Sequence, residues 1–189
     1  MPRPSTKNRL IEHAEAVFRQ KGFNGASVQN ITSAAGVPKG SFYNHFGSKQ
    51  DLAVEIVHRY ATATNLEALQ GERPVLRRLR EHLLGQVERI RMTGVQFGCV
   101  LGTFASDSPT AGDRVREAVG EALTAWTRAV ATAVEEGQAA GDISRNHPAS
   151  AYAVFLIDTL EGATLRAKAT GSDTVVAEEI DIALEALRA

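Results

Sequence analysis

The chain has 189 residues, of which 43% are hydrophobic and 23% are charged, so it can bury a sizeable core and lacks the composition of a disordered protein. Its single cysteine excludes an intramolecular disulfide, and no cysteine or histidine pair has the spacing of a structural zinc site. No stretch reaches about 18 consecutive apolar residues, and the N-terminus lacks an apolar export signal. We therefore expect a cytoplasmic protein that neither spans a membrane nor carries a metal or cofactor.

Charge is distributed unevenly along the chain, although the net charge is only −1. Residues 1–50 carry seven Lys or Arg against two acids, a net of +5, whereas residues 51–189 carry 14 basic and 20 acidic residues, a net of −6. A basic N-terminal segment on an acidic remainder favours a polyanionic partner for that segment, although a solvated basic surface would have the same composition.

Helical periodicity dominates the sequence, and two helices are predicted first. Apolar residues recur at helical spacing from about Lys7 to Lys21, and Gly22 ends this segment. Ser27 suits the N-cap of a second helix, which continues to Ala35 and ends at Gly36.

A brief third helix is predicted over Pro38–Phe46, and a Ser-x-x-Asp pattern at Ser48–Asp51 then caps a fourth. The fourth helix is expected to continue to about Gln70, with Leu52, Ile56, Tyr60 and Ala63 on its inner side. Later helices are expected at about Val75–Met92, Gly98–Ala105, Ala111–Ala139, Pro148–Ala169 and Asp173–Leu187. The fold class is therefore all-α, with a small N-terminal domain (1–50) joined through one continuous helix to a larger helical domain (51–189).

The stretch from Ser27 to Lys49, SVQNITSAAGVPKGSFYNHFGSK, has the layout of a helix-turn-helix, whose second helix enters the DNA major groove. Gly36 permits the sharp turn, and Pro38 sets the start of the recognition helix. Gly40 and Ser41 are small and allow the start of this helix to approach DNA closely, and Phe42 and Phe46, four residues apart, anchor it. Between them, Tyr43, Asn44 and His45 carry polar groups that can reach phosphate. Ser48 and Lys49 then begin a capped helix whose N-terminus attracts a phosphate.

This stretch resembles the TetR family of bacterial transcriptional regulators. The similarity rests on the run from Val37 to Phe46, on Ser48-Lys49 and Leu52, and on the upstream pattern from Leu10 to Gly36; it is strong over residues 7–60 and architectural beyond. The resemblance implies a homodimer with two N-terminal helix-turn-helix heads on a body that binds a ligand. The DNA contacts it implies fall on Ser27, Gln29, Lys39, Gly40, Ser41, Tyr43, His45 and Lys49, although Gln29 departs from members with a basic residue there.

The helical body offers candidate effector-binding residues, which would equally suit a plain core. They are Met92, Phe97, Cys99, Val100, Leu101, Phe104, Trp126, Tyr152 and Phe155. The five histidines are expected at the surface or at helix ends, with His45 set apart by its place in the motif. Asp158 and Glu161 could supply polar groups to a ligand, but we expect them to pair with Arg166 or to face water.

The last two helices carry broad apolar faces, and Gly162 would let two helices approach closely. In the family the corresponding helices form a four-helix dimer interface, and the alternative is packing within one chain.

Cys99, in Phe97-Gly98-Cys99-Val100-Leu101-Gly102, opens a second possibility for the effector. A Gly-Cys at a helix start, together with Ala167-Lys168, resembles a subgroup of TetR-type sensors that respond to electrophiles or oxidants, with the cysteine as the sensing residue. A buried structural thiol is the alternative.

We therefore predict a ligand-responsive transcriptional repressor, not an enzyme, that binds a palindromic double-stranded DNA operator as a homodimer and is released by a small molecule. An electrophile- or oxidant-sensing repressor acting through Cys99 is one alternative. A helical thiol enzyme that pairs Cys99 with a histidine, and a protein adaptor without DNA binding, are alternatives from other classes.

Overall fold

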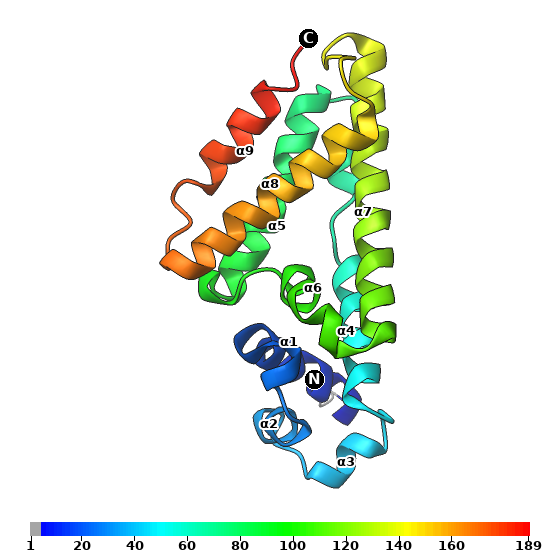
Figure 1. Ribbon diagram of the computed structural model, residues 1–189, viewed down its shortest axis with the longest axis vertical. Helices are drawn as coiled ribbons and strands as arrows, with labels where there is room; N and C mark the ends of the chain where they lie inside the picture. Colours follow the sequence, from blue (N-terminus) through cyan, green and yellow to red (C-terminus); the bar gives the residue numbers. More distant parts are fainter. Residues whose placement is uncertain (1–4) are drawn as a thin grey trace. The chain divides into compact units, whose positions relative to one another are not determined.

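The computed structural model describes residues 5–189 and confirms the all-α prediction: these residues form α-helices and short 3₁₀ helices, with one isolated β-bridge between Ile143 and Arg188 (Figure 1). The helices are α1 (Thr6–Gly25), α2 (Val28–Ala34), α3 (Lys39–Tyr43), α4 (Lys49–Thr62), η1 (Glu67–Leu69), α5 (Val75–Thr93), η2 (Val95–Phe97), α6 (Val100–Ala111), α7 (Asp113–Ala140), α8 (Ala149–Thr170) and α9 (Val176–Glu185). None of the helices in this part of the chain is long and apolar enough to cross a membrane.

The helices fall into two compact units. The first comprises α1 to α4, α6 and the start of α7, within residues 5–62 and 99–122. The second comprises η1, α5, η2, the rest of α7, α8 and α9, within residues 63–98 and 123–189. The first unit therefore contains α6 in addition to the N-terminal helices, whereas the sequence suggested a division near residue 50.

The core of the first unit is an aromatic cluster supported by aliphatic side chains of α1 and α4. The ring of Phe18 lies 5.2 Å from that of Phe104 and 5.9 Å from that of Phe23, and all three are buried. Buried aromatic pairs of this kind add about 0.5–1.5 kcal/mol beyond the area that they bury. They attach α6 to the end of α1.

Helix α4 ends at Thr62, so the prediction that it continues to Gln70 was wrong. Thr62, Thr64 and Asn65 have low helix propensity, and the Thr62 hydroxyl bonds the carbonyl of His58. The backbone carbonyl of Asn65 contacts Nδ1 of His82, and η1 begins shortly afterwards. Ala63, expected on the inner side, is exposed.

Helix α6 is longer than predicted, because it passes through Pro109 and ends at Ala111 rather than at Ala105. A proline inside a helix leaves the carbonyl four residues earlier without its N–H donor. The hydroxyl of Ser108 donates to this carbonyl, that of Ala105, at 2.8 Å and so offsets the loss. Gly94 and Gly98 flank η2 with positive φ angles and separate α5 from α6, where the sequence predicted one helix to end near Met92 and the next to begin near Gly98.

His82 is buried in the second unit, which corrects the prediction that the histidines lie at the surface or at helix ends. Its Nδ1 lies 2.9 Å from the carbonyl of Asn65, and the indole N–H of Trp126 donates to its Nε2 at 2.7 Å. The imidazole is therefore neutral, with its proton on Nδ1. Burial lowers the pKa of His82 below its ordinary value of 6.5.

We expect the stability of the second unit to fall as the pH falls below about 6.5. Because the folded-state pKa is lowered, the unfolded chain binds more protons between the two pKa values, so the free energy of unfolding decreases there by at most about 1.4 kcal/mol per pH unit. Denaturant unfolding followed by circular dichroism from pH 8 to pH 5 measures this, with His82→Gln as the non-titrating control. An equal pH dependence in both proteins would contradict it.

Candidate nucleic-acid interface

The α2–α3 pair forms the helix-turn-helix that the sequence predicted, and its turn is held from α1. Gly36 has a φ of 62°, a value that favours glycine, and the Arg9 guanidinium donates to the carbonyls of Ala35 and Gly36. Ser27 and Asn30 form a reciprocal capping box at the start of α2. The N-terminal end of α2 and its exit turn are therefore both fixed by hydrogen bonds.

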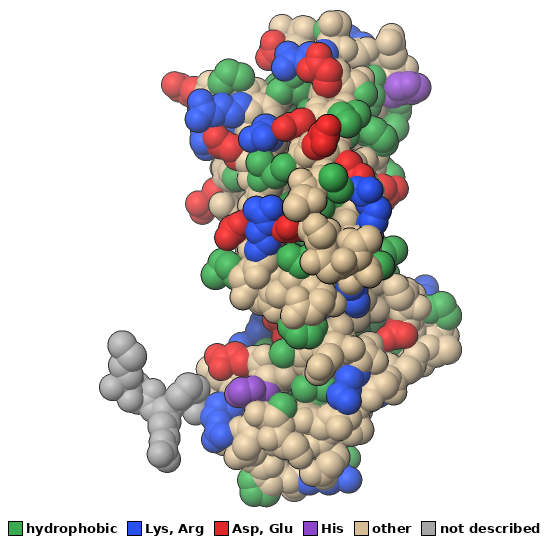
Figure 2. Space-filling model, turned by 90° about the vertical axis from the view of Figure 1, so that its left-hand side faces the viewer, with side chains coloured by type: hydrophobic (Ala, Val, Ile, Leu, Met, Phe, Trp, Pro, Cys, Tyr) green, Lys and Arg blue, Asp and Glu red, His purple; other side chains and the backbone are tan. Residues whose placement is uncertain are grey.

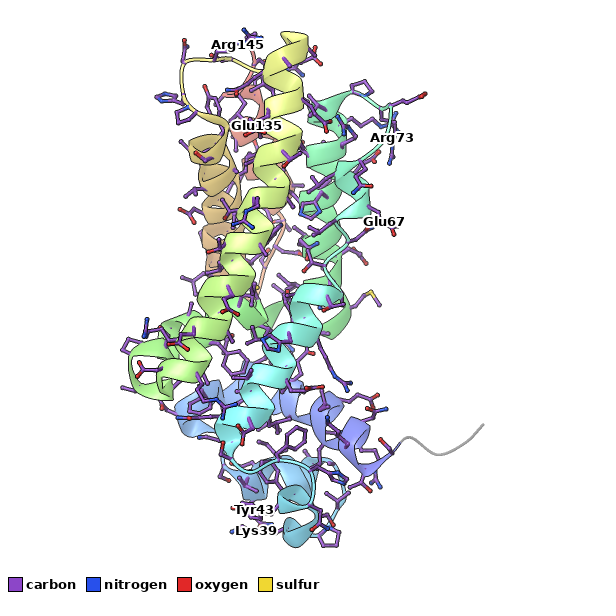
Figure 3. The ribbon with its side chains drawn as sticks, turned by 90° about the vertical axis from the view of Figure 1, so that its right-hand side faces the viewer. Lys39, Tyr43, Glu67, Arg73, Glu135 and Arg145 are labelled. Carbon is purple, nitrogen blue, oxygen red and sulfur yellow. The ribbon has the colours of Figure 1, made fainter. Side chains whose placement is uncertain are left out.

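Helix α3 is anchored by its phenylalanines. Phe42 is completely buried and Phe46 is 5% exposed, with ring centroids 5.7 Å apart, so both are the inward anchors that their spacing predicted. The remaining residues of this segment must face outward, and Lys39, Gly40, Tyr43, Asn44 and His45 are all exposed while Ser41 is half-buried. Figure 3 shows Lys39 and Tyr43 projecting from the same end of the head, with Tyr43 57% exposed.

Three of the eight residues assigned to DNA contact already have partners within the head. The Ser27 hydroxyl caps α2, and the Gln29 amide donates to Ser33. The Lys49 ammonium donates to the carbonyls of Phe23 and Ala26, at 2.7 Å each, and lies 4.2 Å above the Phe23 ring. Desolvation lowers the pKa of Lys49, and the nearby charge of Asp107 opposes this shift. The Lys49 contacts hold the end of α1 directly before α2.

Some of the basic side chains in the N-terminal segment therefore stabilise the fold and do not face solvent. Arg19 is buried against Glu15 and the Tyr60 ring, Arg9 holds the turn, and Lys49 binds carbonyls. Arg3 lies outside the described residues. Lys21 and Lys39 remain exposed. Sequence alone counts all of these charges equally, because it does not reveal which of them point inward.

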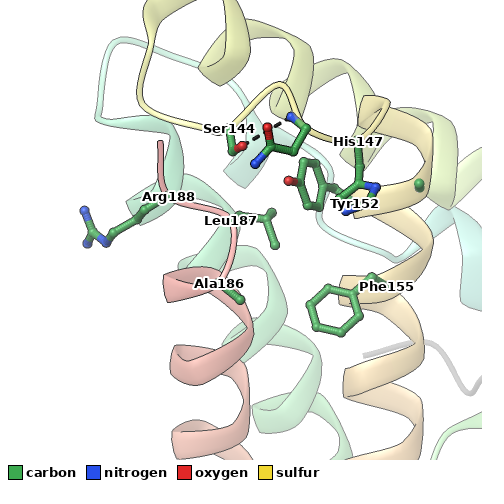
Figure 4. Close-up of a pocket in the computed structure, with 9 residues that line it drawn as sticks. Ser144, His147, Tyr152, Phe155, Ala186, Leu187 and Arg188 are labelled. Atoms are coloured by element: carbon green, nitrogen blue, oxygen red, sulfur yellow. Dashed lines mark hydrogen bonds between the residues drawn. The ribbon is translucent and has the colours of Figure 1, made fainter.

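The residues assigned to effector binding are distributed over both compact units. Cys99, Val100, Leu101 and Phe104 are buried in the first. In the second, Trp126 bonds His82, Phe97 is half-buried in η2, and Met92 is 82% exposed. Tyr152 and Phe155 share a cavity of about 450 Å³, shown in Figure 4. Its other lining residues are Ser144, Asn146, His147, Ala151, Ala186, Leu187 and Arg188.

Two further expectations concern charges. Arg166 pairs with Glu179 of α9, which packs against α8, and Asp158 is exposed to water, one of the two outcomes expected for it. No group of three His, Cys, Asp or Glu residues among residues 5–189 is arranged to hold a metal ion.

The geometry defines a helix-turn-helix DNA-binding protein with an additional helical body. Residues 10–56 match the family described as bacterial regulatory proteins, tetR family, and residues 75–182 match the tetracyclin repressor-like, C-terminal domain. The chain belongs to the TetR family of bacterial transcriptional regulators.

Several relatives resemble the chain over most of its length. The HTH-type transcriptional repressor DhaR of Mycobacterium sp. (strain GP1) is 31% identical over 193 residues, covering 99% of this chain and 94% of DhaR. The transcriptional regulator AcuR of Cereibacter sphaeroides is 35% identical over 162 residues, covering 84% and 72%. The crystal structure of regulatory protein TetR from Rhodobacter sphaeroides superposes with a TM-score of 0.89 at 30% identity, covering 96% and 98% of the two chains. These relatives are regulators and not enzymes, and they identify the chain as a DNA-binding transcriptional repressor.

We expect two lysines of the head to have different roles. Lys39→Ala and Tyr43→Ala should weaken DNA binding and leave the free energy of unfolding within about 0.5 kcal/mol of wild type, because both side chains are exposed. Lys49→Ala should lower the free energy of unfolding by about 1–2 kcal/mol, because two carbonyls lose a charged donor.

Titration with duplex DNA at several salt concentrations, together with denaturant unfolding, measures both effects. Loss of a phosphate contact at Lys39 should reduce the slope of log affinity against log salt by roughly 0.9. Wild-type affinity in both Lys39→Ala and Tyr43→Ala would show that α3 does not contact DNA through these residues.

Proposed function

We propose that the chain represses transcription as a homodimer that binds a palindromic operator and releases it when a small molecule binds the helical body. The observation that carries this proposal is the exposure of Lys39, Gly40 and Tyr43 on α3, and of His45 directly after it, while Phe42 of the same helix is buried. The proposed DNA-contacting set is completed by Ser27, Gln29, Ser41 and Lys49. Of these, Ser27, Gln29 and Lys49 would bind DNA in addition to, or in place of, their present hydrogen bonds within the head. Phosphate contacts would supply most of the salt-dependent affinity, and base contacts would supply specificity.

A second copy of the chain is the proposed occupant of the α8–α9 face. Phe155 and Leu165 of α8 and Ile182 of α9 are 45%, 65% and 64% exposed, and Figure 2 shows hydrophobic side chains among charged ones on the side of the molecule it presents. A groove of about 590 Å³ runs between the two helices past Phe155, Gly162 and Ile182. Exposed apolar surface of this kind favours association, and a twofold dimer would present two recognition helices to an inverted repeat.

Gly162 provides a clean test of this dimer. A Cβ added at Gly162 meets no atom of the protomer within 4 Å, so Gly162→Leu should fold but should obstruct a helix that packs against it. Sedimentation should give a dimer for wild type and a monomer for the variant. Affinity for a duplex that wild type selects from a random pool should fall at least about tenfold, because the second half-site is lost.

Gly85→Leu on α5 is the matched control, because Gly85 is also an exposed helical glycine with open space around it. It should stay dimeric and bind the duplex as wild type does. An undisturbed dimer in Gly162→Leu would exclude Gly162 from the interface, and selected duplexes without an inverted repeat would contradict the palindromic operator.

The effector site is proposed to lie in the body, where an apolar small molecule would contact some of the residues named above: Met92, Phe97, Cys99, Leu101, Phe104, Trp126, Tyr152 and Phe155. The cavity at Tyr152 and Phe155 supports this by its size and its aromatic walls (Figure 4). Binding would favour a body conformation whose two heads no longer match the half-sites.

A covalent variant of this function would act through Cys99. The thiol is 6% exposed at the N-cap of α6, and its Sγ lies 3.5 Å from the Tyr60 hydroxyl of α4. A modification of this thiol would alter the packing of α4 and α6 within the first unit. With a single cysteine in the chain, reversible oxidation would proceed through a sulfenic acid or an intermolecular disulfide.

Treating the DNA complex with N-ethylmaleimide, or separately with hydrogen peroxide, tests the thiol. If Cys99 is the sensor, wild type should release DNA and Cys99→Ser should retain it, because the serine hydroxyl does not react with either reagent at neutral pH. Equal release by both proteins, or no release by wild type, would rule the thiol out and leave the noncovalent effector.

A further inference from the structure

Asp107 of α6 binds the segment Phe23–Ala26, which comprises the end of α1 after the non-helical Gly22 and leads directly to the start of α2. Its Oδ2 accepts the backbone N–H of Phe23 at 2.6 Å, and its Oδ1 accepts the side-chain amide of Asn24 at 3.2 Å. The same Asn24 amide also donates to the Thr110 hydroxyl at 2.6 Å. One carboxylate thus uses both oxygens on two consecutive residues that lie 84 and 83 positions away in the sequence.

Lys49 of α4 also holds this segment, because it donates to the carbonyls of Phe23 and Ala26. The segment is therefore bound by an acid from α6 and a base from α4, and the charges of Asp107 and Lys49 attract each other. Charge-assisted hydrogen bonds are about twice as strong as neutral ones, so these contacts restrict the segment more than backbone bonds alone.

Backbone geometry leaves little freedom for the carboxylate. Gly22 has a φ of 70° and departs from helical geometry inside α1, and a Cβ there would lie 2.6 Å from Asp107 Oδ2. Only the absence of a side chain at Gly22 allows Asp107 to reach the Phe23 N–H.

The bound segment determines how the DNA-facing helices leave α1. It ends at Ala26, directly before Ser27, whose capping box begins α2, and α3 follows through the turn at Gly36. A small rotation at Phe23–Ala26 is therefore carried to Lys39 and Tyr43, although Asp107 lies outside the sequence of the helix-turn-helix.

We propose that Asp107 is a positioning residue for operator recognition: acting through the Phe23 N–H and Asn24, its carboxylate fixes the orientation of α2 and α3 on α1. This inference rests on the proposed function, because it concerns recognition of a specific operator. It makes α6 part of the DNA-binding unit, because the carboxylate that holds the end of α1 comes from this helix.

The test compares Asp107→Asn with wild type on two probes, the duplex that wild type selects from a random pool and a scrambled duplex of the same length and composition. Asn keeps the shape but removes the charge and one acceptor. Affinity for the selected duplex should fall about tenfold. Affinity for the scrambled duplex should stay within about twofold of that of Asp113→Asn, which makes the same change in charge, because nonspecific binding depends on charge and not on orientation. A stoichiometric titration of each protein removes any contribution from an unfolded fraction.

Asp113→Asn is the matched control, because Asp113 is an exposed acid at the start of α7 that pairs only locally with Arg116. It should bind both duplexes as wild type does. Asn24→Ala removes one arm of the contact from an exposed position and should lower affinity for the selected duplex about threefold. Combined with Asp107→Asn, its effect should be smaller than the sum of the single effects, because the two residues share one contact.

The outcomes separate this inference from the proposed function. If wild type selects no duplex, the operator-binding proposal itself is wrong. If wild type selects a duplex that Asp107→Asn binds equally well, or if both duplexes weaken by the same factor, Asp107 does not position the head. Should Asp107→Asn fail to fold, wild-type preference for the selected duplex in Asn24→Ala would overturn the inference.

Discussion

Complete burial of Phe42 is the constraint on which the DNA-binding surface depends. Helix α3 has only five residues, too few to be stable in isolation, so its place and rotation come from what it packs against. With Phe42 in the core and Phe46 beside it, the helix has a single rotational setting, and the residues between them are forced into solvent. The polar character of Tyr43, Asn44 and His45 suits that exposure.

Contacts within the head also determine which of its positive charges face solvent. A net charge of +5 over the first 50 residues suggests a broad basic surface, yet Arg9, Arg19 and Lys49 are used to hold carbonyls, an acid and an aromatic ring. Lys21 and Lys39 remain exposed, and Lys7 is half-buried above the Phe46 ring. Three of the six cations within residues 5–50 therefore support the fold, and the other three are left to attract a phosphate backbone.

Much of the fold could be predicted from local signals. Glycines and caps located the first three helices, and the Ser27 and Ser48 patterns both form the predicted caps. The two errors in helix length have different origins. Helix α4 ends before Thr64 and Asn65, which have low helix propensity, and the Asn65 carbonyl then contacts His82. Helix α6 continues through Pro109 because the neighbouring Ser108 hydroxyl replaces the missing donor. In the candidate site, the outward face of α3 followed from the Phe42–Phe46 spacing, whereas the inward direction of Lys49 and the role of Asp107 depend on partners distant in sequence, which no local pattern encodes.

The indole of Trp126 has a consequence for how this protein can be observed. It is the only tryptophan in the chain, it belongs to the second compact unit, and its N–H is bonded to the buried imidazole of His82. Light absorbed by indole therefore reports on the body and not on the DNA-binding head. Emission from the unaltered protein supplies a natural optical signal for events around α5 and α7, whereas a titration with DNA would need a label on the duplex to become visible.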